Sequence, residues 1–169
     1  MEQAGIAETK EKELIIKRIF AASRQIVWKA WTDPGAVKQW WGPKDFAAPF
    51  IKIDLRVGGE YLYCMHSPEG KDYWSKGVFR EIVPLQRIVC TDSFADEKGT
   101  IVSATYYGMG PDFPLEMLLT VAFEKFDGKT KLTLEHTGIP AGADRDNAWI
   151  GWEQSLDKLD EYLKNQIPI

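Results

Sequence analysis

Two histidines are the side chains of this 169-residue sequence best suited to moving a proton near neutral pH. His136 shares its parity with Leu132 and Leu134, so a strand over residues 129–138 would point its imidazole at the protein interior. There it could act as a general base or a polar handle in a cavity, or be a core histidine bonded to a backbone carbonyl. His66 falls at a strand end beside a loop, where we expect it to be solvated. His136 is therefore the candidate catalytic residue.

Cysteine and metal chemistry have little support. The two cysteines, Cys64 and Cys90, are too few for a disulfide scaffold or a thiolate metal site. Neither lies near a histidine in sequence or a helix N-terminus that would lower its pKa, so both are predicted to be packed thiols. The histidines have no metal-ligand spacing, and no phosphate loop or dinucleotide fingerprint is present. We expect neither a metal nor a cofactor.

The overall composition excludes several classes of partner. A net charge of −4 supplies no general basic face of the kind that nucleic-acid binding needs. No apolar stretch approaches the ~20 residues that span a bilayer, and the acidic N-terminal residues do not resemble a signal peptide. The sequence thus predicts a cytoplasmic protein that neither inserts into membranes nor binds nucleic acid.

Hydrophobic patterning predicts the elements that would position His136. Ser23 caps a short helix, and a second short helix, Gly35–Trp41, follows the break at Asp33-Pro34. Residues 100–115 carry glycine and proline and are expected to be irregular. Alternating or β-branched runs predict strands over residues 13–20, 51–55, 61–66, 73–83, 86–95, 116–126 and 129–138.

A long amphipathic helix is predicted at residues 144–165. Its apolar stripe consists of Trp149, Trp152, Leu156, Leu159 and Leu163. An antiparallel sheet with one apolar face needs a cover, and this helix is the only long amphipathic element. The fold class is therefore α+β, a curved antiparallel sheet around the C-terminal helix. One domain is expected over residues 12–165, with tails at 1–11 and 166–169.

Seven strands exceed what one helix can fill, so a gap between sheet and helix is expected to form a ligand cavity. Seven tryptophans in the chain supply aromatic walls or core packing. The wall candidates are residues of inward parity and those bordering the short helices: Trp31, Trp40, Tyr63, Met65, Trp74, Phe79, Met117, Phe123, His136 and Trp152.

A separate motif, Asp54-Leu55-Arg56-Val57-Gly58-Gly59, ends the second predicted strand. Asp54 and Arg56 share a face and can form an ion pair. This pair is expected either to lie at the mouth of the cavity or to stabilise the turn beside Gly58 and Gly59. Gly58 or Gly59 is expected to supply a bulge or a positive φ.

Several of these stretches, taken together, resemble a known family. RIFAASRQIVWKAWTDPGAVKQWWGP, DLRVGGEYLYCM, GVFREIVP and TKLTLEHTG followed by GWEQSLDKLDEYL are similar to the Hsp90-ATPase-activator homologue domain family of the START/Bet v 1-like superfamily. The resemblance covers residues 12–165 and implies a helix-grip fold with a cavity between sheet and helix. It implies no single chemistry, since superfamily members bind lipids, sterols, hormones or polyketides, some are cyclases or hydratases, and one branch stimulates a chaperone ATPase.

Three functions stay open on this sequence. The first is a non-catalytic protein that binds a small apolar or aromatic ligand through few polar groups: Tyr63, His136 and Arg56. The second is a cyclase- or hydrolase-type enzyme on such a ligand, with His136 as the base. The third is an interaction module whose outer sheet face contacts a chaperone or a second copy of the chain. We expect the first.

Overall fold

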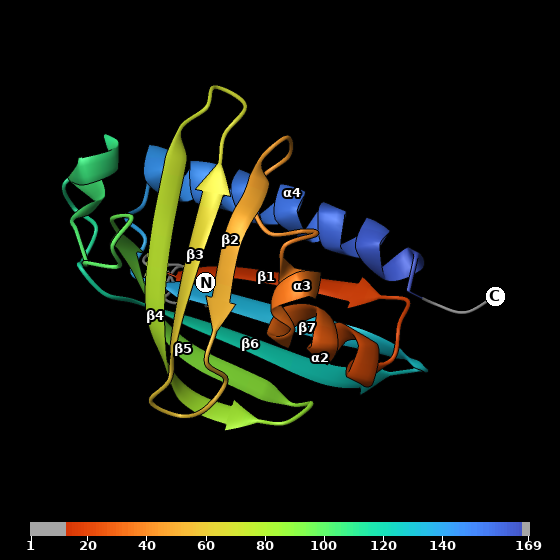
Figure 1. The fold of residues 1–169 in the computed structure, drawn as a ribbon. Coiled ribbons are helices and arrows are strands. Elements are labelled where there is room, and N and C mark those ends of the chain that lie inside the picture. The colour runs from red at the N-terminus through yellow and green to blue at the C-terminus, as the bar shows by residue number, and fades with distance from the viewer. Residues whose placement is uncertain (1–12, 167–169) are drawn as a thin grey trace, which may run out of the picture.

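The computed structural model describes residues 13–166, which form a seven-stranded antiparallel sheet with a long helix against its inner side (Figure 1). The sheet order is β1-β7-β6-β5-β4-β3-β2. The strands are β1 (Glu13–Phe20), β2 (Ala47–Ile53), β3 (Glu60–His66), β4 (Asp72–Val83), β5 (Arg87–Ala95), β6 (Met117–Phe126) and β7 (Lys129–Thr137). The predicted tails lie outside the described residues, apart from Gln166.

Two short helices follow β1, as predicted. Helix α2 (Arg24–Thr32) begins at Ser23, whose hydroxyl accepts a hydrogen bond from the backbone N–H of Ile26. Helix α3 (Pro34–Val37) begins at Asp33, whose carboxylate caps the N–H of Ala36. It ends four residues before the predicted Trp41, because the chain tightens into turns after one helical turn.

Two features were not predicted from the hydrophobic pattern: a helical turn between β5 and β6, and the early start of β2. The predicted irregular stretch 100–115 contains one 3-10 turn, η1 (Ala104–Tyr107). Strand β2 begins at Ala47, before the predicted residue 51, because an irregularity in the pairing with β3 between Ala47 and Phe50 interrupts the alternation.

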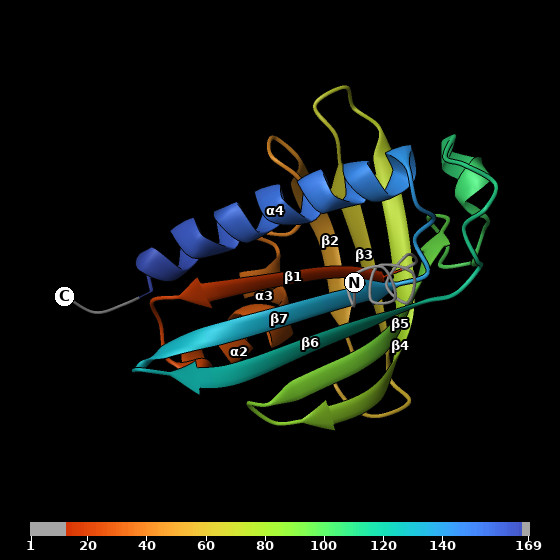
Figure 2. The ribbon, with the colours of Figure 1, turned by 180° about the vertical axis from the view of Figure 1, so that it is seen from behind.

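The sheet is strongly curled. In Figure 1, strands β2, β3 and β4 stand upright while β1, β6 and β7 lie across them. The view from behind shows α4 (Ala143–Lys164) crossing the opened side of the sheet next to β1 (Figure 2). This arrangement confirms the predicted α+β helix-grip fold.

The core lies between the inner face of the sheet and α4. Leu156, Leu159 and Leu163 of α4 are buried there, as the stripe predicted. The prediction that Trp149 belongs to the buried stripe was wrong: it shares a helix face with Leu156 but is 42% exposed, because the N-terminal turns of α4 carry no fully buried residue. The inner-face residues of the strands include Leu14, Ile16, Phe20, Tyr61, Tyr63, Phe79, Ile88, Cys90, Met117, Leu119, Val121, Phe123, Leu132 and Leu134.

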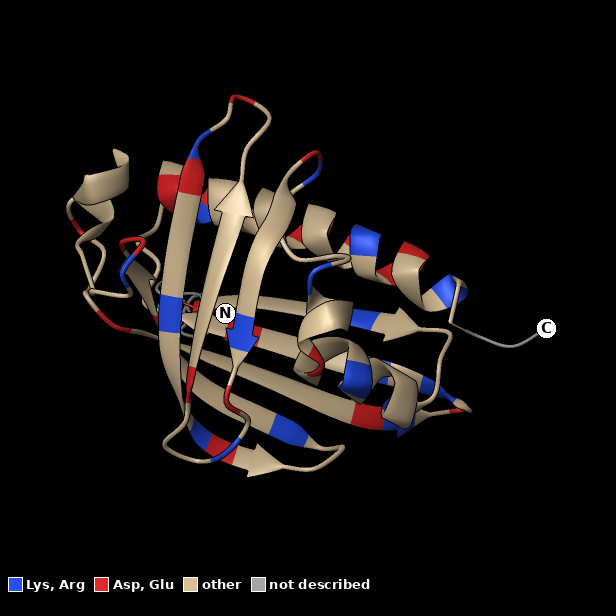
Figure 3. Ribbon diagram, viewed as in Figure 1, with Lys and Arg blue, Asp and Glu red and all other residues tan. Residues whose placement is uncertain are grey.

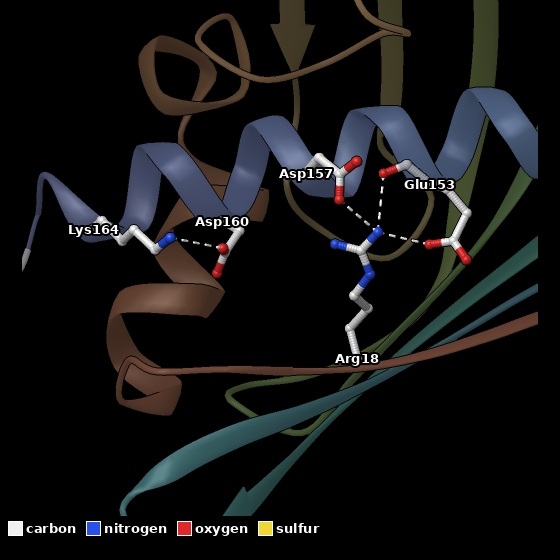
Figure 4. Close-up of polar contacts among 5 residues, drawn as sticks. All are labelled: Arg18, Glu153, Asp157, Asp160 and Lys164. Carbon is white, nitrogen blue, oxygen red and sulfur yellow. Dashed lines mark hydrogen bonds and ion pairs between the residues drawn. The ribbon is translucent and has the colours of Figure 1, made fainter.

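Arg18 ties α4 to the edge strand β1 (Figure 4). Its Nη2 lies 2.7 Å from the Glu153 carboxylate and 2.8 Å from that of Asp157, and it also donates to the Glu153 carbonyl at 3.1 Å. Burial alone would lower the pKa of Arg18, but its hydrogen bonds to both carboxylates outweigh burial and raise it. The guanidinium therefore holds the helix across the open edge of the sheet.

A lysine on α4 closes the loop between α3 and β2. Lys158 Nζ donates to the carbonyls of Gly42, Pro43 and Phe46, at 3.1 to 3.2 Å. Burial lowers the pKa of this ammonium group, although the nearby charge of Asp45 opposes the shift. Because this loop carries the chain from the tryptophan-rich segment into β2, α4 fixes the position of that segment as well.

Charged residues of both signs occur along α4 and near the ends of several strands (Figure 3). Among residues 13–166, no helix is long and apolar enough to cross a bilayer.

Candidate functional site

His136 lies on β7 and faces inward, as its parity predicted, and it is 7% exposed. It belongs to a chain of four interacting side chains that we call the polar network. Trp152 Nε1 on α4 donates to His136 Nδ1 at 3.1 Å, and His136 Nε2 lies 2.8 Å from Asp92 Oδ2 on β5. The Tyr61 hydroxyl on β3 lies 2.8 Å from the other carboxylate oxygen of Asp92. Three strands and α4 therefore converge on one buried imidazole.

The partners of His136 determine its tautomer. An indole nitrogen can only donate, so Nδ1 of His136 must be the acceptor and its proton sits on Nε2. That Nε2–H is not aligned with the carboxylate of Asp92, and within residues 13–166 it has no hydrogen-bond acceptor. The contact with Asp92 is thus electrostatic, and a buried donor stays unsatisfied.

The negative charge of Asp92 influences its neighbours. Burial first, and then this charge, raise the pKa values of Tyr61 and Cys90. Tyr61 consequently stays a protonated donor over the physiological range. The Asp92 side chain is 18% exposed and that of His136 is 9% exposed, so solvent reaches part of the carboxylate.

An aromatic cluster of four rings packs beside the polar network. Trp41 lies 4.8 Å from Tyr63 and 5.4 Å from Trp152, measured between ring centroids. Trp31 lies 6.3 Å from Trp152 in a stacked orientation. Trp31 is 7% exposed, yet its Nε1–H has no acceptor within residues 13–166. Trp152 belongs to both groups and connects them.

Most predicted wall residues do face this interior. Tyr63, Phe79 and Met117 are buried on the inner face, and Met117 is paired in register with Asp92. Phe123 packs against Trp31, with 6.4 Å between the rings.

Two other wall candidates lie away from the polar network. Trp40 is fully buried, with its Nε1 bonded to the Ala30 carbonyl, and belongs to the core. Met65 is only partly buried and lies beside Gly42.

Trp74 is a correction, because it lies on the outer face of the sheet. It is paired in register with Cys64, and its ring packs on Phe50, 5.5 Å away. The inward-facing positions of this part of β4 are Ser75 and Gly77, which are paired in register with the inward-facing Tyr63 and Tyr61. A strand in which aromatic residues occupy both faces does not reveal its inward face by hydrophobicity alone.

The remaining candidates from the sequence are the two cysteines and His66. Cys64 is buried, and burial raises its pKa to about 11; Cys90 is buried as well. The His66 side chain is 47% exposed and paired with Asp72 at 2.6 Å.

The Asp54–Arg56 ion pair forms at 2.9 Å, and the side chain of Arg56 is 69% exposed. Gly58 adopts a φ of +86°, which supplies the positive-φ position expected in this motif. Arg56 thus pairs within its own turn and has no contact with the polar network among residues 13–166.

Sequence reasoning missed Asp92 and Tyr61. The signal for Asp92 was present, because it shares the parity of Cys90 and Phe94 on β5, where a lone carboxylate stands on an apolar face. An acid at such a position needs a partner. The partner could not be named, since 44 residues separate Asp92 from His136 and only the strand register brings them together.

The described hollows lie elsewhere on the surface. One, of about 660 Å³, lies between α2, α3 and the C-terminal turn of α4, and the other, of about 410 Å³, lies along α4 beside it. Gln39, Tyr162 and Asn165 border both. Within residues 13–166, no group of three or more histidine, cysteine or acidic side chains is placed to hold a metal ion.

Comparison with known proteins gives consistent matches. Residues 21–164 match the model of the family described as activator of Hsp90 ATPase homolog 1-like protein. A crystal structure of a protein from Chromobacterium violaceum is similar over 90% of this chain and 96% of that one, with 27% identity and a TM-score of 0.75. A protein from Nitrosomonas europaea is similar over 92% and 96%, with 26% identity and a TM-score of 0.72.

A third crystal structure, a protein from Silicibacter pomeroyi whose name carries the same family label, is 24% identical over 92% of this chain and 99% of that one, with a TM-score of 0.68. No curated protein matches the sequence significantly.

Proposed function

The chain belongs to the family of activator of Hsp90 ATPase homolog 1-like proteins, and from that premise we propose that it binds a small apolar or aromatic ligand between the sheet and α4. The helix-grip fold supports this proposal, because the curled sheet and α4 enclose an interior lined by apolar and aromatic side chains that a ligand can contact. The ligand would contact the aromatic cluster and the polar network.

The observation that carries the proposal is the convergence of four aromatic rings with a buried, partly solvent-reached polar group. Binding sites for small molecules are mostly apolar and aromatic, with a few placed polar groups that orient the ligand. Trp41 and Trp152 are only partly buried and border the site. Neither of the two surface hollows includes Trp41 or Trp152. A ligand would therefore have to push these two rings apart to reach the site.

Catalysis by His136 is the second candidate, and the contact with Asp92 is the observation that favours it. A histidine beside a carboxylate is a common arrangement for a general base. The lone pair of His136, however, accepts from Trp152, so proton abstraction would require that indole to move first. This constraint is the reason we place binding ahead of catalysis.

An interaction with a chaperone, which the family name suggests, has less support. On the β1–β7–β6 half of the outer face, Ile19 stands next to Lys131, and Lys131 stands next to Glu124. Apolar side chains there are interrupted by charges, so this half offers no continuous apolar patch among the described residues.

Binding of N-phenyl-1-naphthylamine, a neutral apolar fluorescent probe, tests the proposal. We expect about one probe per chain, with a change in tryptophan emission as the probe contacts the aromatic cluster. Met117→Lys should weaken binding, and Met117→Trp, which fills the same space without a charge, should do so too. Leu118→Lys is the matched control, because Leu118 is the next residue on β6 and is 40% exposed on the outer face.

Three results would contradict the proposal. The probe could fail to bind, it could bind both Met117 variants as tightly as the unmodified chain, or its binding could be abolished by Gln39→Arg. The last result would locate the probe in the surface hollows instead.

A further inference from the structure

The polar network contains an unsatisfied donor and an available acceptor side by side. His136 Nε2–H has no aligned acceptor within residues 13–166, although the side chain is only 9% exposed. Asp92 Oδ1 receives the Tyr61 hydroxyl, while Asp92 Oδ2 faces Nε2 at 2.8 Å without an aligned hydrogen bond. A buried donor without an acceptor is costly, so this pair is suited to a group from outside that can both accept and donate.

A hydroxyl has this combination, since it offers one O–H donor and two acceptor lone pairs. We infer that the site takes a neutral aromatic molecule carrying a hydroxyl group, which accepts from His136 Nε2–H and donates to Asp92 Oδ2. This inference rests on the proposed function and specifies its ligand class. The aromatic part of the ligand would lie against Trp41 and Trp152.

Other polar groups fit less well. A ligand carboxylate would place a second negative charge beside Asp92 in a site with little solvent, where like charges repel strongly. An ether or ketone oxygen could accept from His136 but would leave Asp92 Oδ2 without a donor. A ligand with no polar atom would leave both groups unsatisfied, and sites built to bind a hydroxyl reject such analogues strongly.

Four naphthalenes of similar shape separate these cases: 2-naphthol, 2-methoxynaphthalene, 2-methylnaphthalene and 2-naphthoate. Dissociation constants for the unmodified chain are measured at pH 7 by quenching of tryptophan emission and by calorimetry. We expect 2-naphthol to bind about 10- to 100-fold more tightly than 2-methylnaphthalene, the effect of hydrogen bonding to a charged group. The methoxy compound should fall between them, and 2-naphthoate should bind most weakly.

Variants then locate the effect. Asp92→Asn and His136→Phe should each reduce the preference for 2-naphthol over 2-methylnaphthalene to less than about threefold, because each removes one partner of the hydroxyl. His66→Phe is the matched control: it makes the same change at a histidine that is 47% exposed and pairs with Asp72, outside the polar network, and it should leave the preference intact. Circular dichroism confirms that each variant is folded.

The outcomes distinguish the inference from the proposed function. If none of the four compounds binds, the proposed function fails. If they bind with equal affinity, or if 2-naphthoate binds best, the hydroxyl inference is wrong while ligand binding stands. A preference that persists in both Asp92→Asn and His136→Phe would also overturn it. The comparison of ligands uses the unmodified chain, so the result does not depend on any variant folding.

Discussion

The ring of Tyr61 lies over the backbone of Gly77, in the space that a β-carbon at this position would occupy. The two residues are paired in register on β3 and β4, and the same hypothetical β-carbon would also overlap the carbonyl oxygen of Thr91. Residue 77 must therefore be glycine, because the Tyr61 ring and the Thr91 carbonyl oxygen leave no room for a β-carbon. This contact sets the position of the Tyr61 hydroxyl, which donates to Asp92.

Gly77→Ala should consequently destabilise the protein by about 1–3 kcal/mol, because the added methyl group must displace an aromatic ring or a strand. Urea denaturation measures the change. Gly35→Ala is the control, since a β-carbon there would meet its nearest neighbour, a carboxylate oxygen of Asp33, at 3.4 Å. Equal stability of the two variants would contradict the close contact between Tyr61 and Gly77.

Arg18→Gln should reduce the free energy of unfolding by about 1–2 kcal/mol, allowing for partial screening by solvent. The loss should shrink in high salt, because charge attraction contributes to it. Lys164→Gln is a matched control: Lys164 also pairs with an acidic residue of α4, Asp160, but its side chain is 61% exposed (Figure 4). No measurable loss is expected there. If both variants behave alike, Arg18 does not anchor α4.

Leu156→Ala should cost about 2–5 kcal/mol, because Leu156 is fully buried between α4 and the sheet. Ile150→Ala, on the same helix but 53% exposed, should change stability by less than about 0.5 kcal/mol. Thermal and urea unfolding of both variants provide the test. A loss below about 1 kcal/mol for Leu156→Ala would show that α4 contributes little to the core.

Two buried tyrosines predict a loss of stability at alkaline pH. Burial, with smaller contributions from nearby charges, raises the pKa values of Tyr61 and Tyr63 in the folded protein. Above about pH 10 the unfolded chain releases these protons while the folded protein keeps them. The folded state then binds more protons, so the free energy of unfolding falls by about 1.4 kcal/mol per pH unit for each tyrosine. Below pH 10 this contribution is constant.

Urea titrations at pH 9, 10 and 11 measure that slope. Tyr63→Phe is the sharper variant, because the hydroxyl of Tyr61 also bonds the Thr91 carbonyl and Asp92, and Tyr61→Phe would remove those bonds as well. The decline between pH 10 and 11 should be shallower in Tyr63→Phe than in the unmodified chain. Parallel curves would mean that Tyr63 ionises in the folded state near its ordinary pKa.

The tautomer of His136 is directly observable. Long-range ¹H–¹⁵N correlation spectra should show the proton on Nε2, because Nδ1 accepts from Trp152. In Trp152→Phe the donor is lost, and both tautomers become accessible. A proton found on Nδ1 in the unmodified chain would rule out the hydrogen bond from Trp152 and with it the basis for the hydroxyl inference.

The fold could be predicted from the sequence because its signals are local. Alternation along the strands, the cap at Ser23, the break at Asp33-Pro34, and the spacing of Leu156, Leu159 and Leu163 each require only neighbouring residues. The errors arose where two apolar surfaces compete within one element. Trp149 continues the apolar spacing of α4 but lies beyond the edge of the covered face.

The site was only half predictable, for a different reason. Parity correctly oriented His136, but its partners Asp92 and Trp152 come from another strand and from α4. Which strands are neighbours, and in what register, depends on the assembled sheet. Two residues that meet only through long-range strand pairing have no characteristic separation in the sequence, so their contact cannot be predicted from spacing.

The order of the sheet also determines when folding can finish. Among residues 13–166, strand β1 lies at one edge of the sheet and pairs with β7 alone, with register partners more than a hundred residues apart. Bringing such distant residues together costs chain entropy before their contacts can form, and this cost slows folding. During synthesis the first strand would have to wait until nearly the whole domain has left the ribosome. Until then, the apolar side of β1 and the inner face of the unfinished sheet are exposed together, and such exposed apolar surface is prone to aggregate.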